Sequence, residues 1–236
     1  MRIALIGYGK MGKAIEKIAT DNGHDVVYKI DANDSIEVID AAKVDVAIEF
    51  TQPNSAFNNL SYCMENGIPV ISGTTGWLEK KTEIEEICRA KNGTFLYASN
   101  YSIGVNLFFE LNEWLAEKMK SLYFSSSITE VHHTEKKDSP SGTAITIAEG
   151  MLKHNPTKND WINEETTDHQ KLSIISERKP NVPGTHTVSY SSELESIEIK
   201  HTAHDRSVFA QGVVKVAEWI HTRKGIFTMS DFINDN

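Results

Sequence analysis

The chain has 236 residues, of which 39% are hydrophobic and 24% charged, a composition that excludes a mainly disordered or fibrous protein. Its 24 basic and 33 acidic residues give a net charge of −9. A net anion does not attract nucleic acid or anionic lipid in general, so we expect neither a nucleic-acid nor a membrane partner.

Strands and helices alternate from the N-terminus to about residue 104. A continuous apolar run predicts a strand buried on both faces at residues 2–6, and further strands are predicted at 25–30, 44–50, 69–72 and 94–98. Apolar residues at helical spacing predict helices that begin after Gly12 and end near Asn22, and helices at 55–66 and 78–92. This alternation predicts an α/β fold with a Rossmann-type parallel sheet.

The turn after the first strand carries the motif Gly7-x-Gly9-x-x-Gly12. The first glycine permits a tight turn, the second lets backbone approach a pyrophosphate, and the third lets helix and strand pack closely. Asp31, 19 residues after Gly12, ends the second strand, where a carboxylate holds ribose hydroxyls. A dinucleotide site is therefore predicted; the plainer alternative is a glycine-rich turn and a solvated aspartate.

Asp31 also bears on the choice of cofactor. Its carboxylate repels a 2′-phosphate, and the next residue is Ala32 rather than an arginine. We therefore hypothesise that NADH is used at least as well as NADPH. Lys29, Arg2 and Lys10 are the nearby cations that could offset this repulsion.

Three further strand ends are expected at the same crevice, because ligands of open α/β sheets lie beyond the carboxyl ends of the strands. These ends carry small residues, hydroxyls and backbone amides, at Phe50-Thr51, Gly73-Thr74-Thr75 and Ala98-Ser99-Asn100-Tyr101. Each one alone is equally consistent with ordinary turn chemistry.

The pattern changes after Gly104. Helices are predicted at residues 105–119, 144–152 and 208–220, and strands at 126–132, 171–177, 185–191 and 196–201. Residues 154–170 are polar and aperiodic, so we expect a loop there. We expect a separate α+β domain with a mostly antiparallel sheet at 105–206. Residues 1–104 and 207–236 are expected to form the dinucleotide-binding domain.

The segment from Glu130 to Ala144 predicts an anion site. Ser141 can cap the helix at 144–152, which leaves the backbone amides of Gly142 and Thr143 pointing out of its N-terminus. Cationic or proton-bearing side chains precede this helix, at His132, His133, Lys136 and Lys137. Neighbouring histidines on a strand face opposite ways, so only one of the pair points fully into a pocket.

Two alternatives remain for this segment. A metal site could use His132, His133 and Asp138, but their spacing fits no usual zinc pattern, and we expect no metal. The other is a solvated, charged loop beside one core histidine.

Residues Glu130–Ala144 resemble the E-x-H-H-x-x-K-x-D-A-P-S-G-T-A signature of the 4-hydroxy-tetrahydrodipicolinate reductases, also called dihydrodipicolinate reductases. The sequence departs from it only at Ser139, where the family has alanine. The glycine loop is similar to the family's, though one residue shorter than G-x-x-G-x-M-G. Further matching motifs follow in register along nearly the whole chain: Glu49-Phe50-Thr51-x-Pro53, Gly73-Thr74-Thr75-Gly76, Ala98–Asn106, Val182-Pro183-Gly184-Thr185 and His201-x-Ala203-x-x-Arg206.

The resemblance implies an enzyme that reduces a cyclic imine dicarboxylate with NADH or NADPH, a step toward diaminopimelate and lysine. It implies a general acid/base at His132, a proton donor at Lys136, and substrate carboxylate contacts at His133, Gly142 and Thr143. It also implies that residues 105–206 form a substrate-binding and oligomerisation domain, with a homotetramer assembled through the sheets of that domain. It leaves Arg206 without a clear role. The implied cofactor-binding residues are Gly7, Tyr8, Gly9, Lys10, Met11, Gly12, Asp31, Gly73, Thr74, Thr75, Ala98, Ser99, Asn100 and Tyr101.

Two other classes remain open. One is a Rossmann oxidoreductase for another imine or carbonyl, which need not carry the His132-His133-x-x-Lys136 segment with its Pro-Ser-Gly-Thr helix start. The other is a non-catalytic NAD(P)H sensor, which needs neither His132 nor Lys136.

The cysteines and the apolar runs bear on location. Cys63 and Cys88 form no CxxC motif, so free thiols in a reducing compartment are the simplest interpretation. No apolar run approaches the ~18 residues of a membrane span, and the stretch from Arg2 to Gly7 is too short for a secretory signal. We expect a cytoplasmic protein.

Overall fold

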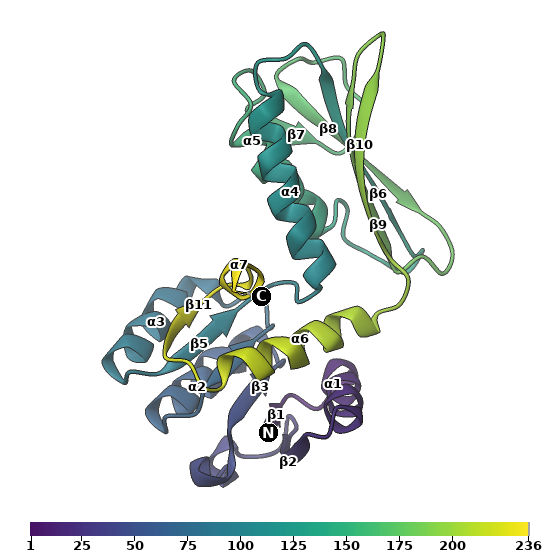
Figure 1. Ribbon diagram of the computed structural model, residues 1–236. Coiled ribbons are helices and arrows are strands. Elements are labelled where there is room, and N and C mark those ends of the chain that lie inside the picture. The colour runs from purple at the N-terminus through teal and green to yellow at the C-terminus, as the bar shows by residue number, and fades with distance from the viewer. Residues whose placement is uncertain (236) are drawn as a thin grey trace. The chain divides into compact units, whose positions relative to one another are not determined.

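A computed structural model describes residues 1–235 and divides them into two compact units. The first unit comprises Met1–Ile103 and the segment from Ser207 onward, and the second is Gly104–Arg206 (Figure 1). Within residues 1–235, no helix combines the length and the hydropathy that crossing a membrane requires.

The first unit is built on a six-stranded sheet in which every pair of neighbours is parallel. The strand order is β11-β5-β4-β3-β1-β2. The strands are β1 (Arg2–Ile6), β2 (Asp25–Ile30), β3 (Val46–Glu49), β4 (Val70–Ser72), β5 (Thr94–Tyr97) and β11 (Gly225–Phe227). The predicted Rossmann-type parallel sheet is confirmed; the short edge strand β11 was not predicted.

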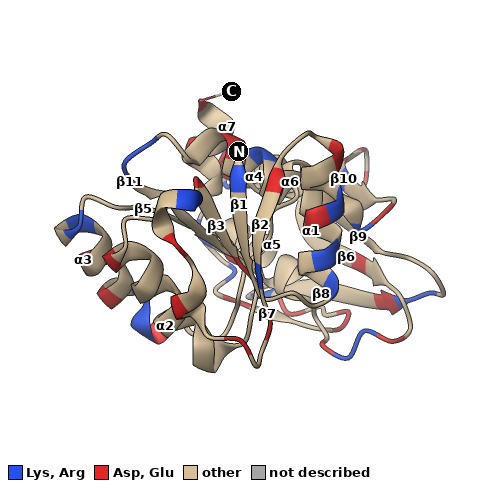
Figure 2. Cartoon of the chain, turned by 90° about the horizontal axis from the view of Figure 1, so that it is seen from below, with Lys and Arg blue, Asp and Glu red and all other residues tan. Residues whose placement is uncertain are grey.

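Helices cover both faces of this sheet because the strands β1, β3, β4 and β5 are buried on both sides. The α-helices are α1 (Lys10–Asp21), α2 (Pro53–Glu65), α3 (Lys81–Ala90), α6 (Ser207–Ile220) and α7 (Met229–Asn234). Short 3₁₀ turns lie at Ile36–Val38, Ala41–Lys43 and Leu78–Lys80. On α3, lysine and arginine side chains flank Glu85 at i,i+4 spacing, and the blue and red segments of the helix mark this mixed surface (Figure 2).

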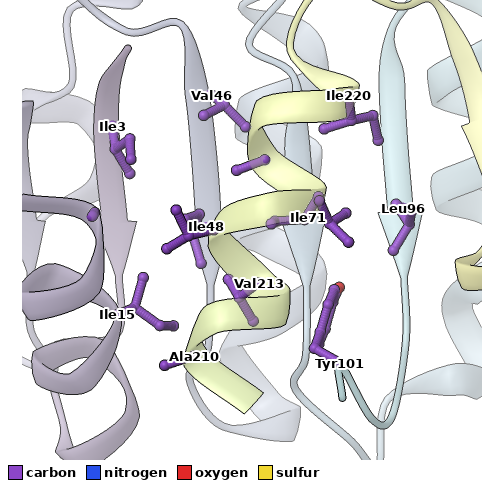
Figure 3. Packing of buried hydrophobic residues seen from close by; sticks show 14 of the residues in the cluster. Ile3, Ile15, Val46, Ile48, Ile71, Leu96, Tyr101, Ala210, Val213 and Ile220 are labelled. Atoms are coloured by element: carbon purple, nitrogen blue, oxygen red, sulfur yellow. The ribbon is translucent and has the colours of Figure 1, made fainter. Parts of the chain in front are cut away.

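The face covered by α1 and α6 holds the larger part of the core. Ile3 and Leu5 of β1 point to this face, whereas Ala4 and Ile6 point to the face covered by α2 and α3, as the period of a strand requires. Figure 3 shows α6 running along the strands it covers, with Val213 among their apolar side chains. A Cβ on Gly212 would lie 1.7 Å from the Tyr101 carbonyl oxygen, so only glycine allows this approach of α6.

The second unit packs two helices on one face of a five-stranded sheet of order β10-β9-β6-β8-β7. Its elements are α4 (Ile103–Met119), β6 (Ser125–His132), α5 (Gly142–Leu152), β7 (Asp160–Ile162), β8 (Lys171–Arg178), β9 (Gly184–Ser191) and β10 (Ser196–Ala203). Ile128, Ile174 and Val188 share the covered face with apolar residues of α4 and α5. The predicted α+β organisation is confirmed.

The strand directions in this sheet are mixed. β9 is antiparallel to β6 and β10, as predicted, but β8 is parallel to β6 and β7. The parallel pairs arise because α5 carries the chain from the end of β6 back across the sheet before the next strand starts. The prediction of a loop over residues 154–170 was wrong for Asp160–Ile162, which form β7. This strand is too short to give a periodic pattern in the sequence.

Candidate active site

Two adjoining cavities lie at the carboxyl ends of the strands of the first unit. The larger, about 540 Å³, is lined by residues that include Tyr8 and Asp31; the smaller, about 310 Å³, includes Met11 and Thr75. Gly9, Phe50 and Thr51 line both. The two cavities thus join the predicted ribose site at the end of β2 to the predicted glycine turn at Gly73, as a dinucleotide site requires.

The three glycines of the motif have separable roles. Gly7 has φ +98°, and a Cβ there would lie 1.9 Å from the Phe50 carbonyl oxygen. A Cβ on Gly12 would lie 2.3 Å from the Gly7 carbonyl oxygen, whereas a Cβ on Gly9 would have no atom within 4 Å. Gly7 and Gly12 are therefore required by the turn itself. Gly9 faces open space as the N-cap of α1, where no side chain occupies the helix amides.

The charges around Asp31 are arranged against a phosphate. Asp31 accepts a hydrogen bond from the Ala32 amide (2.8 Å), and Asp34 accepts one from the Asp31 amide (2.8 Å), so two carboxylates line the larger cavity. Lys29 forms an ion pair with Glu16, and that hydrogen bond raises the pKa of the lysine. Lys29 is thus already neutralised by a partner.

The strand end at residues 98–101 lines neither of these two cavities. Tyr101 is buried and donates a hydrogen bond to the Ser72 carbonyl oxygen (2.7 Å), and its ring lies 5.8 Å from that of Phe50. In this arrangement Tyr101 fixes the end of β5 against the end of β4. The cofactor contacts predicted for Ala98, Ser99, Asn100 and Tyr101 stay predictions.

In the second unit, the predicted acid/base His132 lies beside a buried glutamate. The Nδ1 atom of His132 is 3.3 Å from Oε2 of Glu130, which has no exposed surface. Glu130 also accepts hydrogen bonds from the Ser141 amide (3.1 Å) and the Ser176 hydroxyl (2.7 Å). Burial, the largest single influence, acts to raise the pKa of Glu130, but its hydrogen bonds together hold that pKa well below the usual range. Glu130 is therefore an anion beside the His132 ring.

A second histidine, His186 on β9, completes this cluster. Its Nε2 atom lies 3.2 Å from the Ser141 hydroxyl and 3.7 Å from Glu130, and its ring centroid lies 5.1 Å from that of His132. Burial, with a smaller effect of a positive charge on His132, lowers the pKa of His186 from 6.5 to about 4. Our sequence reasoning gave no role to Glu130 or His186. Their proximity follows from the register of β6 and β9, which pairs these two residues. That register cannot be read from the sequence of either strand alone.

The pKa of His186 predicts how stability depends on pH. In the unfolded chain this histidine becomes protonated below about pH 6.5, whereas in the folded chain it becomes protonated only below about pH 4. Between these values the unfolded state binds more protons, so the free energy of unfolding falls on acidification. Between pH 7 and pH 5 we expect His186→Asn to lose about 2 kcal/mol less than the wild type does. Urea unfolding at the two pH values measures this difference; equal losses would contradict it.

The loop after β6 places the other predicted residues. The Nζ atom of Lys136 lies 2.8 Å from Asp138. The Nη2 atom of Arg206, which the sequence left without a role, lies 2.7 Å from Nε2 of His133. Because arginine can only donate, Nε2 of His133 accepts, and Nδ1 carries the hydrogen shared with Glu135 (3.1 Å). His132 is buried and His133 half-buried at the strand end, consistent with their predicted opposite orientations.

The N-terminus of α5 has the predicted form. The Ser141 hydroxyl accepts a hydrogen bond from the Ala144 amide (3.1 Å), which leaves the amides of Gly142 and Thr143 in the first turn. A Cβ on Gly142 would meet no atom within 4 Å, so the space beside this helix end is open. An eleven-residue helix with a free first turn can hold a carboxylate.

Metal-ligand atoms of Glu130, His132 and His186 lie within 4.8 Å of one another. They are not the set that the sequence offered as an alternative, His132, His133 and Asp138. Arg178 lies 3.5 Å from Glu130, and hydrogen-bond donors already occupy that carboxylate. A neighbouring guanidinium opposes a bound cation, so the geometry favours a network of polar side chains around the Glu130 carboxylate over a metal site.

The chain matches known proteins along its whole length. The family models described as "Dihydrodipicolinate reductase, N-terminus" and "Dihydrodipicolinate reductase, C-terminus" match residues 1–101 and 104–233. The 4-hydroxy-tetrahydrodipicolinate reductase of Christiangramia forsetii is 47% identical over 100% of this chain and 98% of its own. That of Thermosipho africanus is 34% identical over 100% and 99%.

A solved structure shows the same fold. Dipicolinate-bound dihydrodipicolinate reductase from Paenisporosarcina sp. TG-14 superposes with a TM-score of 0.77 at 23% identity, covering 97% of each chain. An amine dehydrogenase from Mycobacterium smegmatis superposes with a TM-score of 0.63 at 10% identity, covering 97% of this chain and 95% of that one.

Proposed function

The chain belongs to the dihydrodipicolinate reductase family, and we propose that His132 and Lys136 carry out the proton chemistry of its reaction. The enzyme reduces 4-hydroxy-tetrahydrodipicolinate with NAD(P)H, in the biosynthesis of diaminopimelate and lysine. The two cavities, the open space at Gly9 and the uncapped N-terminus of α1 fit a dinucleotide. When bound, the reduced nicotinamide supplies the hydride.

The contacts of Glu130 are the observation that supports the role of His132. Hydride addition to a conjugated imine leaves negative charge on the substrate, which a placed acid relieves by protonation. Glu130 faces Nδ1 of His132, which leaves Nε2 to deliver the proton. Nε2 lies 3.1 Å from the Cβ position of Gly184, so the absence of a side chain there keeps this atom accessible.

The same glutamate supports the placement of the substrate. Glu130 also accepts from the Ser141 amide at the start of α5, so one carboxylate positions both the acid and the helix end that would bind a substrate carboxylate. The amides of Gly142 and Thr143 would hold one carboxylate, and His133 would hold the other once that carboxylate replaces Glu135 as the acceptor of its Nδ1 hydrogen, with Lys136 as a nearby positive charge. A dianionic substrate needs such local donors because the chain carries a net charge of −9.

Lys136 and its neighbour provide a matched pair of variants. Lys136→Ala should lower kcat and raise KM together, because the ammonium would act both on proton transfer and on a carboxylate. Lys137→Ala removes an equal charge from an exposed position one residue away and should change neither value by more than about twofold. Steady-state kinetics with substrate generated in situ measures both; a Lys136→Ala effect confined to cofactor affinity would place Lys136 in the other site.

The cavity charges predict the cofactor preference. With Asp31 and Asp34 at the larger cavity and Lys29 paired with Glu16, kcat/KM for NADH should equal or exceed that for NADPH. Asp31→Asn should raise the relative use of NADPH by roughly tenfold, since it removes one charge facing the 2′-phosphate. Asp25→Asn, at the opposite end of β2, is the control. A hundredfold preference of the wild type for NADPH would contradict the hypothesis.

The second unit also bears on assembly. One face of its sheet carries half-buried polar residues of β6 and β9 such as Thr129 and Thr187, and α4 and α5 pack on the other face. This composition supports a homotetramer formed through the sheets of the second units, acting in the cytoplasm without a nucleic-acid or membrane partner. Sedimentation equilibrium tests the assembly; a monomer at micromolar concentration would exclude it.

A further inference from the structure

Glu49, the last residue of β3, is a carboxylate with no exposed surface at the strand ends that line the two cavities. Oε2 accepts a hydrogen bond from the Ser72 hydroxyl (2.6 Å). Oε1 accepts from the Thr74 hydroxyl (2.8 Å), the Thr51 amide (3.1 Å) and the Thr51 hydroxyl. All of these partners are uncharged. The proton chemistry proposed above makes no use of this group.

The hydrogen-bond directions assign Glu49 as ionised. The Thr51 hydroxyl accepts a hydrogen bond from the side-chain amide of Asn59 (3.3 Å), so its own hydrogen is available to Glu49. The Thr74 hydroxyl oxygen accepts a hydrogen bond from the Thr51 amide (2.7 Å), so the hydrogen of the Thr74 hydroxyl is also available to Glu49. With the hydrogens of both threonine hydroxyls directed at Oε1 and the Ser72 hydroxyl beside Oε2, the donors around Glu49 stabilise its carboxylate form. The strand ends therefore enclose a negative charge.

The position of this charge in the crevice follows from the sheet order. The ribose site at Asp31 lies on β2, and the pyrophosphate site lies at the start of α1, which follows β1. The other half of a dinucleotide then extends over the next strands in the sheet, β3 and β4. Thr51 and Thr74, the partners of Glu49, line the smaller cavity there.

We propose that Glu49 is an electrostatic positioning residue of the cofactor site, which holds Thr51 and Thr74 in place and favours the oxidised, positively charged nicotinamide. This inference rests on the proposed placement of the cofactor. Loss of a hydride, one proton with two electrons, to the substrate leaves one positive charge on the ring. The substrate gains the negative charge that the proton from His132 neutralises. A fixed buried anion behind the lining of the smaller cavity would stabilise the first of these charges.

The test compares the affinities of the two cofactor forms. Glutamine fits in place of Glu49, because its oxygen can accept from Thr51 while the Ser72 hydroxyl rotates to accept from its amide group. In Glu49→Gln, we expect the ratio Kd(NAD⁺)/Kd(NADH) to rise roughly tenfold, the scale for unit charges about 10 Å apart at an effective dielectric constant near 20. Calorimetric titration with each cofactor form gives both constants.

Two further variants separate charge from geometry. Ser72→Ala removes one donor and keeps the carboxylate, and Glu49→Asp keeps the charge on a shorter side chain. Both variants should weaken the binding of NAD⁺ and NADH to a similar extent. The ratio Kd(NAD⁺)/Kd(NADH) should then stay within about twofold of the wild type. Glu49→Asp also keeps the proposal testable if Glu49→Gln does not fold, since a ratio raised about tenfold in the aspartate variant would overturn the role of charge.

Other results overturn the proposal as well. Equal weakening of NAD⁺ and NADH in Glu49→Gln would reduce Glu49 to a structural residue, and unchanged constants would remove it from the site. These titrations need no dicarboxylate substrate, so a failure of the proposed His132 chemistry leaves their outcome unaffected. A wild-type chain that bound neither form would overturn the cofactor placement and this inference together.

Discussion

His132→Gln is expected to lower kcat by roughly 10²-fold or more, the usual scale for the loss of a general acid. Glutamine keeps a polar side chain beside Glu130 but cannot exchange a proton at neutral pH. The dissociation constant for NADH should stay within about twofold of the wild type, because neither His132 nor the residues that contact it line the two cavities beside the glycine motif. Stopped-flow measurement of NADH oxidation, with titration of NADH in parallel, checks both values.

His169→Gln is the matched control for this variant. His169 lies exposed between β7 and β8, and its replacement should leave kcat unchanged within the error of the assay. If His132→Gln retained full kcat, His132 would have no part in proton transfer. The acid would then have to be sought among the remaining groups of the Glu130 network.

Gly7→Ala is expected to destabilise the protein by about 3 kcal/mol. Alanine disfavours the positive φ of this position, and its Cβ would clash with a backbone carbonyl oxygen. The Phe50 oxygen that would lie 1.9 Å from the new Cβ belongs to the segment after β3, which cannot move without breaking the sheet. For a chain of this length the melting temperature should fall by roughly 10 °C. Differential scanning calorimetry measures the fall.

Gly9→Ala, two residues along, is expected to show the opposite pattern. Its Cβ meets no protein atom and its φ of −79° suits alanine, so the melting temperature should stay within about 2 °C of the wild type. The added methyl group would occupy the space in which the backbone approaches a pyrophosphate. The dissociation constant for NADH should therefore rise by about tenfold or more. A Gly9→Ala variant with normal NADH affinity would place the pyrophosphate elsewhere.

The extent to which the sequence predicts this structure differs between local and long-range features. Gly7, Gly9 and Gly12 are separated by a few residues, and they predicted the turn together with the strand before it and the apolar residues at helical spacing after it. The Ser141 cap was predictable for the same reason, since capping involves neighbours along the chain. Both features depend on local steric and hydrogen-bonding rules that act within one turn.

The Glu130 network could not be predicted in this way. His186 lies 56 positions from Glu130, and the two meet only because β6 and β9 pair in one register. A shift of that register by one residue would turn His186 to the other face of the sheet. Glu49 was equally hidden, because a single acidic residue in an apolar strand does not reveal the Ser72 and Thr74 hydroxyls on the neighbouring segment. The short strands β7 and β11 lack enough residues for a periodic signal.

The position of α6 in the chain has a consequence for biosynthesis. The ribosome completes β1, β3, β4 and β5 before residues 104–206, and only afterwards makes the helix whose Val213 packs on their apolar face. At about 5–20 residues per second, this interval lasts roughly 5–20 s. Throughout it the nascent sheet presents Ile48, Ile71 and Leu96 without their cover, a surface that chaperones at the ribosomal exit tunnel recognise. Folding of the nucleotide-binding half is thus timed by translation of the other half.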